Sequence, residues 1–135
     1  MPCHVVERVA QALAEQGKTL NGAKVLILGA AYKKNVDDTR ESPALRIMEL
    51  LHARGAQVNY HDHYVPKLGR MRRYNFGLES VPLCAETLRA HDCSLIVTDH
   101  SCVDYRLVVT ESPLVVDTRN ATRNVRAGQA KVIRC

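Results

Sequence analysis

The sequence predicts a three-layer α/β/α fold with a doubly wound, mostly parallel sheet of about five or six strands. Three observations support this fold class. Strand-like apolar runs alternate with helical patterns in the order βαβαβ. The predicted strand over Lys24–Leu28 contains four consecutive apolar residues, as expected where helices cover both faces of a parallel sheet. A length of 135 residues with 46% hydrophobic and 24% charged residues is typical of one globular domain.

The first half of the chain predicts a helix and then a strand–helix–strand unit. A helix is expected over Pro2–Glu15, where Val6, Val9, Ala10 and Leu13 recur at the spacing of one helix face. After the strand over Lys24–Leu28, Ser42 as N-cap and a proline at the first helical position start a helix over Pro43–Arg54. A strand over Ala56–His61 follows, and a unit of this length predicts a right-handed crossover with parallel pairing.

The second half of the chain has weaker patterns. We expect residues 66–82 to form a loop, with a short strand near Ser80. The following elements are then expected: a short helix over Cys84–Ala90, a strand over Ser94–Thr98, a helical turn or two over Tyr105–Glu111, a strand over Leu114–Asp117 and an edge strand over Lys131–Arg134.

The loop after the first strand carries the densest group of polar side chains. In open α/β sheets, ligands bind at the carboxyl ends of the strands, so a ligand site is expected here. The loop contains one glycine, Gly29, where a dinucleotide fold would have G-x-G-x-x-G. It is thus a Rossmann-like strand–loop–helix without the fingerprint, and any phosphorylated ligand would depend on side chains such as Lys33, Lys34 and Arg40. A solvated connection is the alternative interpretation.

Four segments occur in an order that points to a known family: GAAYKKNVDDTRESPAL (29–45), NYHDHYVP (59–66), IVTDHSCVDY (96–105) and VVDTRNATR (115–123). Together they resemble the C-terminal, UDP-binding domain of the UDP-glucose/GDP-mannose dehydrogenase family, and the resemblance covers nearly the whole chain. Within the family, the sequence looks closest to bacterial UDP-N-acetylhexosamine 6-dehydrogenases. One departure is His63, which stands where family members usually have proline.

The resemblance implies a function for the larger enzyme. It would be an NAD-dependent UDP-sugar dehydrogenase that oxidises the C6 hydroxyl of the sugar to a carboxylate. Residues 1–20 would be the end of the inter-domain connecting helix, and residues 21–135 the UDP-sugar-binding domain. The family's N-terminal glycine fingerprint and its catalytic G-G-x-C type motif are absent from this sequence. We therefore expect no turnover by this chain alone, with NAD bound mainly by the N-terminal half, and the full-length protein could form a homodimer.

The resemblance also implies roles for individual residues of the first loop. Tyr32 and Lys33 would contact the nucleotide sugar, since an aromatic ring can stack on a base or sugar and an ammonium group can neutralise a diphosphate. Arg40 stands where the family has an arginine near NAD, and its planar guanidinium can bind a phosphate or a carbonyl in two places. Asp38 and Glu41 would orient Arg40.

Arg119 is the third residue that the resemblance assigns to the nucleotide sugar. It follows the predicted strand over Leu114–Asp117, at the same edge of the sheet as the first loop. The alternative is a helix N-terminus, with Asp117 or Thr118 as its cap.

Other chemistry-bearing residues do not assemble into a known site. His61 and His63 share a strand face, but a third metal ligand at suitable spacing is missing, so no metal is expected. Asp62 could bind a ribose, yet that role accompanies the absent glycine fingerprint. Cys102 lies near Asp99 and His100, but residues this close along a loop cannot be assumed to form a catalytic relay. No catalytic residue is assigned.

Composition and charge limit the remaining function classes. The longest apolar runs have four or five residues, so no membrane span is expected. Five scattered cysteines without a C-x-x-C pair indicate reduced thiols in a cytoplasmic protein. A net charge of +5 suits an anionic small molecule or nucleic acid. The basic residues of 67–73 lack a nucleic-acid-binding motif and are expected in a solvated loop. A stand-alone nucleotide-binding or regulatory module, and less so a nucleic-acid-binding protein, are the alternatives.

Overall fold

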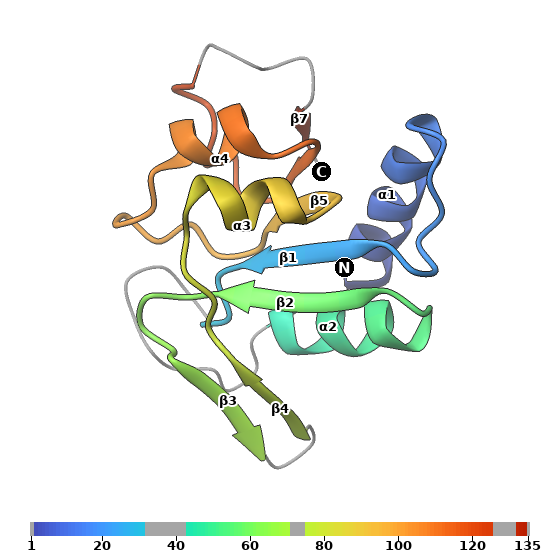
Figure 1. The fold of residues 1–135 in the computed structure, drawn as a ribbon, viewed down its shortest axis with the longest axis horizontal. Coiled ribbons are helices and arrows are strands. Elements are labelled where there is room, and N and C mark those ends of the chain that lie inside the picture. The colour runs from blue at the N-terminus through green and yellow to red at the C-terminus, as the bar shows by residue number, and fades with distance from the viewer. Residues whose placement is uncertain (1, 32–42, 71–74, 126–131, 135) are drawn as a thin grey trace.

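The computed structural model describes residues 2–31, 43–70, 75–125 and 132–134. Its main sheet has five strands in the order β2-β1-β5-β6-β7, all paired in parallel. Helices cover both faces of this sheet (Figure 1). The elements are α1 (Pro2–Glu15), β1 (Lys24–Leu28), α2 (Pro43–Ala53), β2 (Gln57–His61), β3 (Lys67–Arg70), β4 (Asn75–Glu79), α3 (Ala85–Ala90), β5 (Cys93–Ile96), α4 (Tyr105–Glu111), β6 (Val115–Asp117) and β7 (Val132–Arg134). The predicted three-layer α/β/α fold is confirmed.

Strand β1 lies inside the sheet and separates two apolar cores. Because side chains alternate along a strand, Val25 and Ile27 contribute to the core beneath α1 and α2. Leu26 and Leu28 contribute to the core beneath α3 and α4. All four side chains are at most 1% exposed, and burial of one such side chain stabilises the fold by about 1.5–3 kcal/mol. The continuous apolar run of β1 thus reflects a strand covered on both faces.

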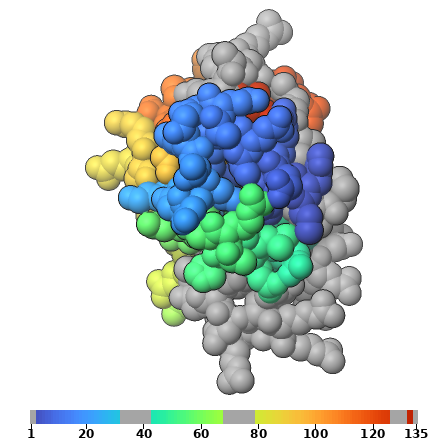
Figure 2. All heavy atoms as spheres, turned by 90° about the vertical axis from the view of Figure 1, so that its right-hand side faces the viewer, coloured from blue at the N-terminus to red at the C-terminus, as the bar shows by residue number. Residues whose placement is uncertain are grey.

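Helix α1 packs beside α2 over the first core (Figure 2). Its buried residues follow the predicted helical spacing, with Ala12 buried and Ala10 partly exposed: Val5, Val6, Val9, Ala12 and Leu13. An ion pair between Arg54, which follows α2, and Glu7 of α1 joins the exposed sides of the two helices. The helix therefore belongs to the same packed unit as the sheet. None of the described helices is long and apolar enough to cross a membrane.

The expected loop over residues 66–82 is wrong in part. Strands β3 and β4 form a separate antiparallel pair, whose register shifts between Leu68 and Arg70. The chain after β4 returns to the main sheet, where Val81 donates a backbone hydrogen bond to the carbonyl oxygen of Tyr60 at 2.9 Å. Lys67, from the basic segment, pairs with Glu79 across the hairpin at 3.8 Å. Arg72 and Arg73 lie outside the described residues.

Candidate ligand site at the carboxyl edge of the sheet

The order of the sheet reverses beside β1, which creates a crevice between the ends of β1 and β5. The chain passes from β1 outward to β2 on one side, while β5, β6 and β7 extend the sheet on the other side. In open α/β sheets, ligands bind outside the carboxyl ends of the strands at such a switch point. The polar residues that follow β1, β2, β5 and β6 are therefore the candidates for a ligand site.

Gly29 allows the chain leaving β1 to pass very close to the end of β5. Its φ is +95°, and a Cβ at this position would lie 2.5 Å from Cβ of Thr98. Its backbone N–H donates to the carbonyl oxygen of His61 at 3.0 Å. Only glycine fits this combination of positive φ and close approach. The one glycine of the predicted binding loop thus serves the packing of two strand ends.

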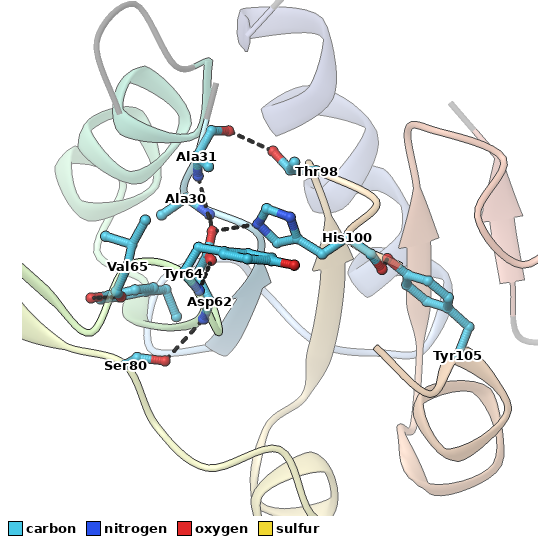
Figure 3. A network of polar contacts seen from close by, with 10 residues as sticks. Ala30, Ala31, Asp62, Tyr64, Val65, Ser80, Thr98, His100 and Tyr105 are labelled. Atoms are coloured by element: carbon cyan, nitrogen blue, oxygen red, sulfur yellow. Dashed lines mark hydrogen bonds and ion pairs between the residues drawn. The ribbon is translucent and has the colours of Figure 1, made fainter. Parts of the chain in front are cut away.

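Ala30 and Ala31 are held by polar groups from two neighbouring segments (Figure 3). Their backbone N–H groups donate to Oδ2 of Asp62 at 2.7 and 3.0 Å. The carbonyl oxygen of Ala31 accepts a hydrogen bond from Oγ1 of Thr98 at 2.7 Å. The peptide groups that lead into the predicted loop are therefore fixed at both donor and acceptor. The predicted contacts Tyr32, Lys33 and Arg40 themselves lie outside the described residues.

Asp62, the first residue after β2, is buried and fully engaged within the protein. It is 2% exposed. Besides the two alanine N–H groups, its Oδ2 atom bonds Nε2 of His100 at 2.8 Å, while Oδ1 accepts from the N–H of Tyr64 at 2.8 Å. A buried carboxylate needs this number of donors, because burial without them would be costly. The geometry assigns Asp62 an internal role rather than contact with a ribose.

The turn that follows β2 fixes the position of Asp62. The buried Tyr60 donates its hydroxyl hydrogen to the carbonyl oxygen of Val65 at 2.8 Å, and the backbone N–H of Val65 donates to the carbonyl oxygen of Asp62 at 3.2 Å. Burial, followed by the nearby Asp62 charge, raises the pKa of Tyr60 to about 12. The hydroxyl of Ser80 accepts from the N–H of Asp62 at 2.9 Å. The phenol therefore acts as a neutral hydrogen-bond donor inside the turn.

His100 is surrounded by groups from α4 and from the turn after β2. Its side chain is 1% exposed, its ring lies 4.8 Å from the ring of Tyr64, and its carbonyl oxygen accepts from the hydroxyl of Tyr105 at 3.1 Å. Burial and then the charge of Asp99 raise the pKa of Tyr105. Because Nε2 of His100 bonds Asp62 while Cys102 is exposed, the geometry gives no support to a thiol nucleophile at Cys102.

Asp117, the last residue of β6, organises the next turn. Its buried carboxylate accepts from the backbone N–H groups of Arg119 at 3.0 Å, Ala121 at 3.1 Å and Thr122 at 2.9 Å, and from the hydroxyl of Thr122 at 2.7 Å. Burial alone would raise the pKa of Asp117, but these hydrogen bonds outweigh it and hold the pKa below its usual value. Asn120 adopts a φ of 56° within the turn. The capping role considered for Asp117 is therefore present.

The side chain of Arg119 extends from this turn to the end of β5. Its Nε atom donates to the carbonyl oxygen of Val97 at 2.9 Å. Within the described ranges, no residue accepts a hydrogen bond from its two terminal nitrogens, and the residue as a whole is exposed. The adjacent Thr98 binds Ala31. One short segment after β5 thus holds both Arg119 and the chain that leads to Tyr32.

The two histidines that flank Asp62 do not form a metal site. Nδ1 of His61 lies 2.7 Å from the carbonyl oxygen of Val81, whereas His63 is exposed and its ring packs edge-on against Tyr64. Among the residues that could be searched, no group of three or more potential metal ligands occurs.

Sequence reasoning missed the Asp62–His100 pair and the hydrogen bond from Thr98. Each of these residues directly follows a strand of the sheet or lies within a few residues of its end. That position was the available signal, because the carboxyl ends of parallel strands meet at one edge.

The fold and this polar edge define a class of protein, the Rossmann-like α/β domains with a ligand site at the switch point of the sheet. Residues 26–124 match the model of the UDP binding domain of the UDP-glucose/GDP-mannose dehydrogenase family. The chain belongs to this family.

Curated relatives are dehydrogenases of UDP-sugars. The chain is 29% identical over 128 residues to a UDP-N-acetyl-D-mannosamine dehydrogenase of Methanococcus maripaludis, covering 89% of this chain and 27% of that protein. It is 32% identical over 117 residues to a UDP-glucose 6-dehydrogenase of Rhizobium meliloti, covering 82% of this chain and 26% of that protein. The chain thus spans about a quarter of the length of these relatives.

Solved structures show the same fold. A UDP-D-ManNAc dehydrogenase from Pyrococcus horikoshii matches with a TM-score of 0.76 and 24% identity, over 98% of this chain and 30% of that one. An NDP-N-acetyl-D-galactosaminuronic acid dehydrogenase from Methanosarcina mazei Go1 matches with a TM-score of 0.75 and 25% identity, over 99% of this chain and 28% of that one.

Proposed function

We propose that this chain is the nucleotide-sugar-binding, C-terminal domain of an NAD-dependent UDP-sugar 6-dehydrogenase, which oxidises the C6 hydroxyl of the sugar to a carboxylate. The chain supplies the UDP-binding part, and the N-terminal half of the enzyme supplies the principal NAD site and the catalytic cysteine. The chain alone does not turn over. The observation that carries the proposal is the position of Arg119 beside the switch point of the sheet in a member of this family.

Arg119, Tyr32 and Lys33 are the proposed contacts to the UDP-sugar. The bond from Nε to Val97 restrains the guanidinium plane of Arg119, so its terminal nitrogens are the atoms left to bind a phosphate or a uracil carbonyl. A planar, pre-oriented guanidinium suits such two-point contacts. Lys33 would neutralise the diphosphate, and Tyr32 would stack on the base or the sugar.

The residues of this chain do not fit a principal dinucleotide site of their own. In such a site, glycines let the backbone N–H groups after the first strand approach the pyrophosphate. Here the N–H groups of Ala30 and Ala31 donate to Asp62 instead. Arg40 is proposed as the single contact from this chain to NAD, which supports the assignment of most of the NAD site to the other half.

The proposed arrangement includes partners and a location. Residues 1–20, which include α1, form the end of a connecting helix, and residues 21–135 form the binding domain. The N-terminal half of the dehydrogenase is the protein partner, and a homodimer of the full-length enzyme is proposed. The thiols of the described cysteines Cys3, Cys84, Cys93 and Cys102 are free, which supports a cytoplasmic location.

An NMR titration of the ¹⁵N-labelled chain with UDP, UDP-N-acetylglucosamine and NAD, each added separately, tests the proposal. We expect shifts from both uridine ligands, centred on Arg119, Lys33 and Tyr32, with a dissociation constant of about 1 mM, or ~4 kcal/mol. Arg119→Ala should weaken UDP binding about tenfold or more, since a hydrogen bond to a charged group contributes about 1.5–3 kcal/mol. Lys33→Ala should also weaken it.

Arg106→Ala is the matched control, because Arg106 is an exposed arginine of α4 whose loss changes the net charge equally. Its affinity for UDP should equal that of the wild type. Unchanged spectra with UDP and UDP-N-acetylglucosamine would contradict the proposal. Tight binding of UDP by the isolated chain would instead indicate a stand-alone nucleotide-binding module.

A further inference from the structure

The Asp62–His100 pair joins three segments that are far apart in the sequence (Figure 3). Oδ2 of Asp62, after β2, accepts from Ala30 and Ala31, after β1, and bonds Nε2 of His100, after β5, at 2.8 Å. The side chains of His100 and Asp62 are 1% and 0% exposed. Three neighbouring strands of the sheet therefore end at one carboxylate oxygen.

Burial makes this junction geometrically strict. A buried carboxylate oxygen that loses a donor is not compensated by water, so the donors and the acceptor must keep their mutual positions. Tyr64 donates to the other oxygen of the carboxylate, and its ring packs on the ring of His100. The hydroxyl of Tyr105 holds the backbone of His100. The imidazole and the carboxylate are thus each restrained from a second side.

The junction is connected to the candidate ligand site through the segment after β5. His100 lies two residues beyond Thr98, which binds the carbonyl oxygen of Ala31, and three beyond Val97, which accepts from Arg119. Loss of the imidazole would free the segment that carries both bonds and would release Oδ2 from its fixed position under Ala30 and Ala31. The relative placement of Ala31 and Arg119 therefore depends on His100.

We propose that Asp62 and His100 are positioning residues of the UDP site. They do not contact the nucleotide. They hold the peptide of Ala31 and the Val97–Thr98 segment at the separation at which side chains from both can bind one diphosphate. This inference rests on the proposed function. Small errors of placement in a binding site have large effects, since a shift of about 1 Å can reduce a rate about 100-fold.

The test compares UDP binding by the 135-residue chain carrying His100→Leu or His100→Gln. Gln can place its amide N–H₂ near the position of Nε2 and donate to Asp62, whereas Leu cannot. We expect His100→Leu to weaken UDP binding about tenfold or more, and His100→Gln to restore most of the affinity. The amide proton resonances of Ala30 and Ala31 should move upfield in the leucine variant and stay near their wild-type positions in the glutamine variant.

Ser94→Ala provides a matched control for loss of stability alone. Ser94 and Ser112 form a buried hydroxyl pair at 2.8 Å, and both lie toward the amino-terminal ends of β5 and β6. Its loss should destabilise the fold without changing UDP affinity or the resonances of the two alanines. Should His100→Leu fail to fold, Thr98→Val removes only the bond to Ala31 and should also weaken binding.

The outcomes separate the two proposals. If the wild type shows no UDP binding, the proposed function and this inference fall together. If the wild type binds UDP and the folded variants His100→Leu and Thr98→Val bind it equally well, only the positioning role is overturned. Weakening by Leu and Val with rescue by Gln supports it.

Discussion

Strand β1 is held at both ends by an aspartate from a neighbouring segment, and the two aspartates differ in burial. At its start, Asp92 accepts from the backbone N–H of Lys24 at 2.9 Å and from Nζ of Lys18 at 3.0 Å. Beyond its end, Asp62 accepts from Ala30 and Ala31. The side chain of Asp92 is 33% exposed, whereas that of Asp62 is 0% exposed.

The difference in burial predicts a difference in function. Water can replace the partners of Asp92, so its bonds add modest stability and tolerate movement. Water cannot reach Asp62, so its partners must stay in place for the fold to remain stable. The amino edge of the sheet is therefore tied adaptably and the carboxyl edge rigidly, which is what a ligand site at the carboxyl edge requires.

Removal of each carboxylate is the strongest test of this comparison. Asp62→Ala leaves the N–H groups of Ala30 and Ala31 and the imidazole of His100 buried without their acceptor, and we expect a loss of about 3–5 kcal/mol in the free energy of unfolding. Asp92→Ala should cost about 0.2–1 kcal/mol. Urea unfolding followed by circular dichroism measures both values, and equal losses would refute the contrast.

Two glycines with positive φ flank β1 and extend the comparison. Gly29 has φ +95° and faces Thr98 at the carboxyl edge, whereas Gly22 has φ +85° with nothing within 4 Å of an added Cβ at the amino edge. Gly29→Ala should cost about 2–4 kcal/mol, because strain at positive φ adds to a steric clash. Gly22→Ala, which carries only the backbone strain, should cost about 1 kcal/mol. Thermal unfolding of both variants gives the difference.

Asp117 should make the carboxyl edge sensitive to acid. Its pKa is lowered in the folded protein, so its stabilising contribution is complete above the unfolded-state pKa of about 3.9 and is lost as the pH falls through the lower folded-state pKa. Asp117→Asn should cost about 2 kcal/mol at pH 7. Urea unfolding at pH 7, 4 and 3 should show the gap between wild type and variant narrowing below pH 4. A constant gap would contradict this assignment.

The sequence predicted the main sheet well because its signals are local. The apolar run of β1 and the helical spacing in α1 identify buried faces without knowledge of their partners. The β3–β4 pair was missed, because its strands are short and are recognisable mainly through their pairing with each other. The strand limits of β5 also differ, since Val97 and Thr98 both donate to the carbonyl oxygen of Leu28 beyond the last paired residue.

Prediction of the candidate site was less complete for a related reason. His100 attracted attention as a neighbour of Cys102, although its Nε2 atom bonds a residue 38 positions away. Only the strand order brings these residues together. For the turn after β6, the sequence left open a cap at Asp117 or a ligand contact at Arg119. The cap is present, and the contact remains a prediction that the same turn makes sterically compatible with it.

The occupied N–H groups of Ala30 and Ala31 have a consequence for how ligand preference can evolve in this domain. A site built on main-chain donors keeps its chemistry under most substitutions, because every residue carries the same amide. Here those donors are already bonded to a carboxylate of the protein. Recognition is left to side chains, so single codon changes in the surrounding loops can alter which ligand is accepted while the strand framework remains the same.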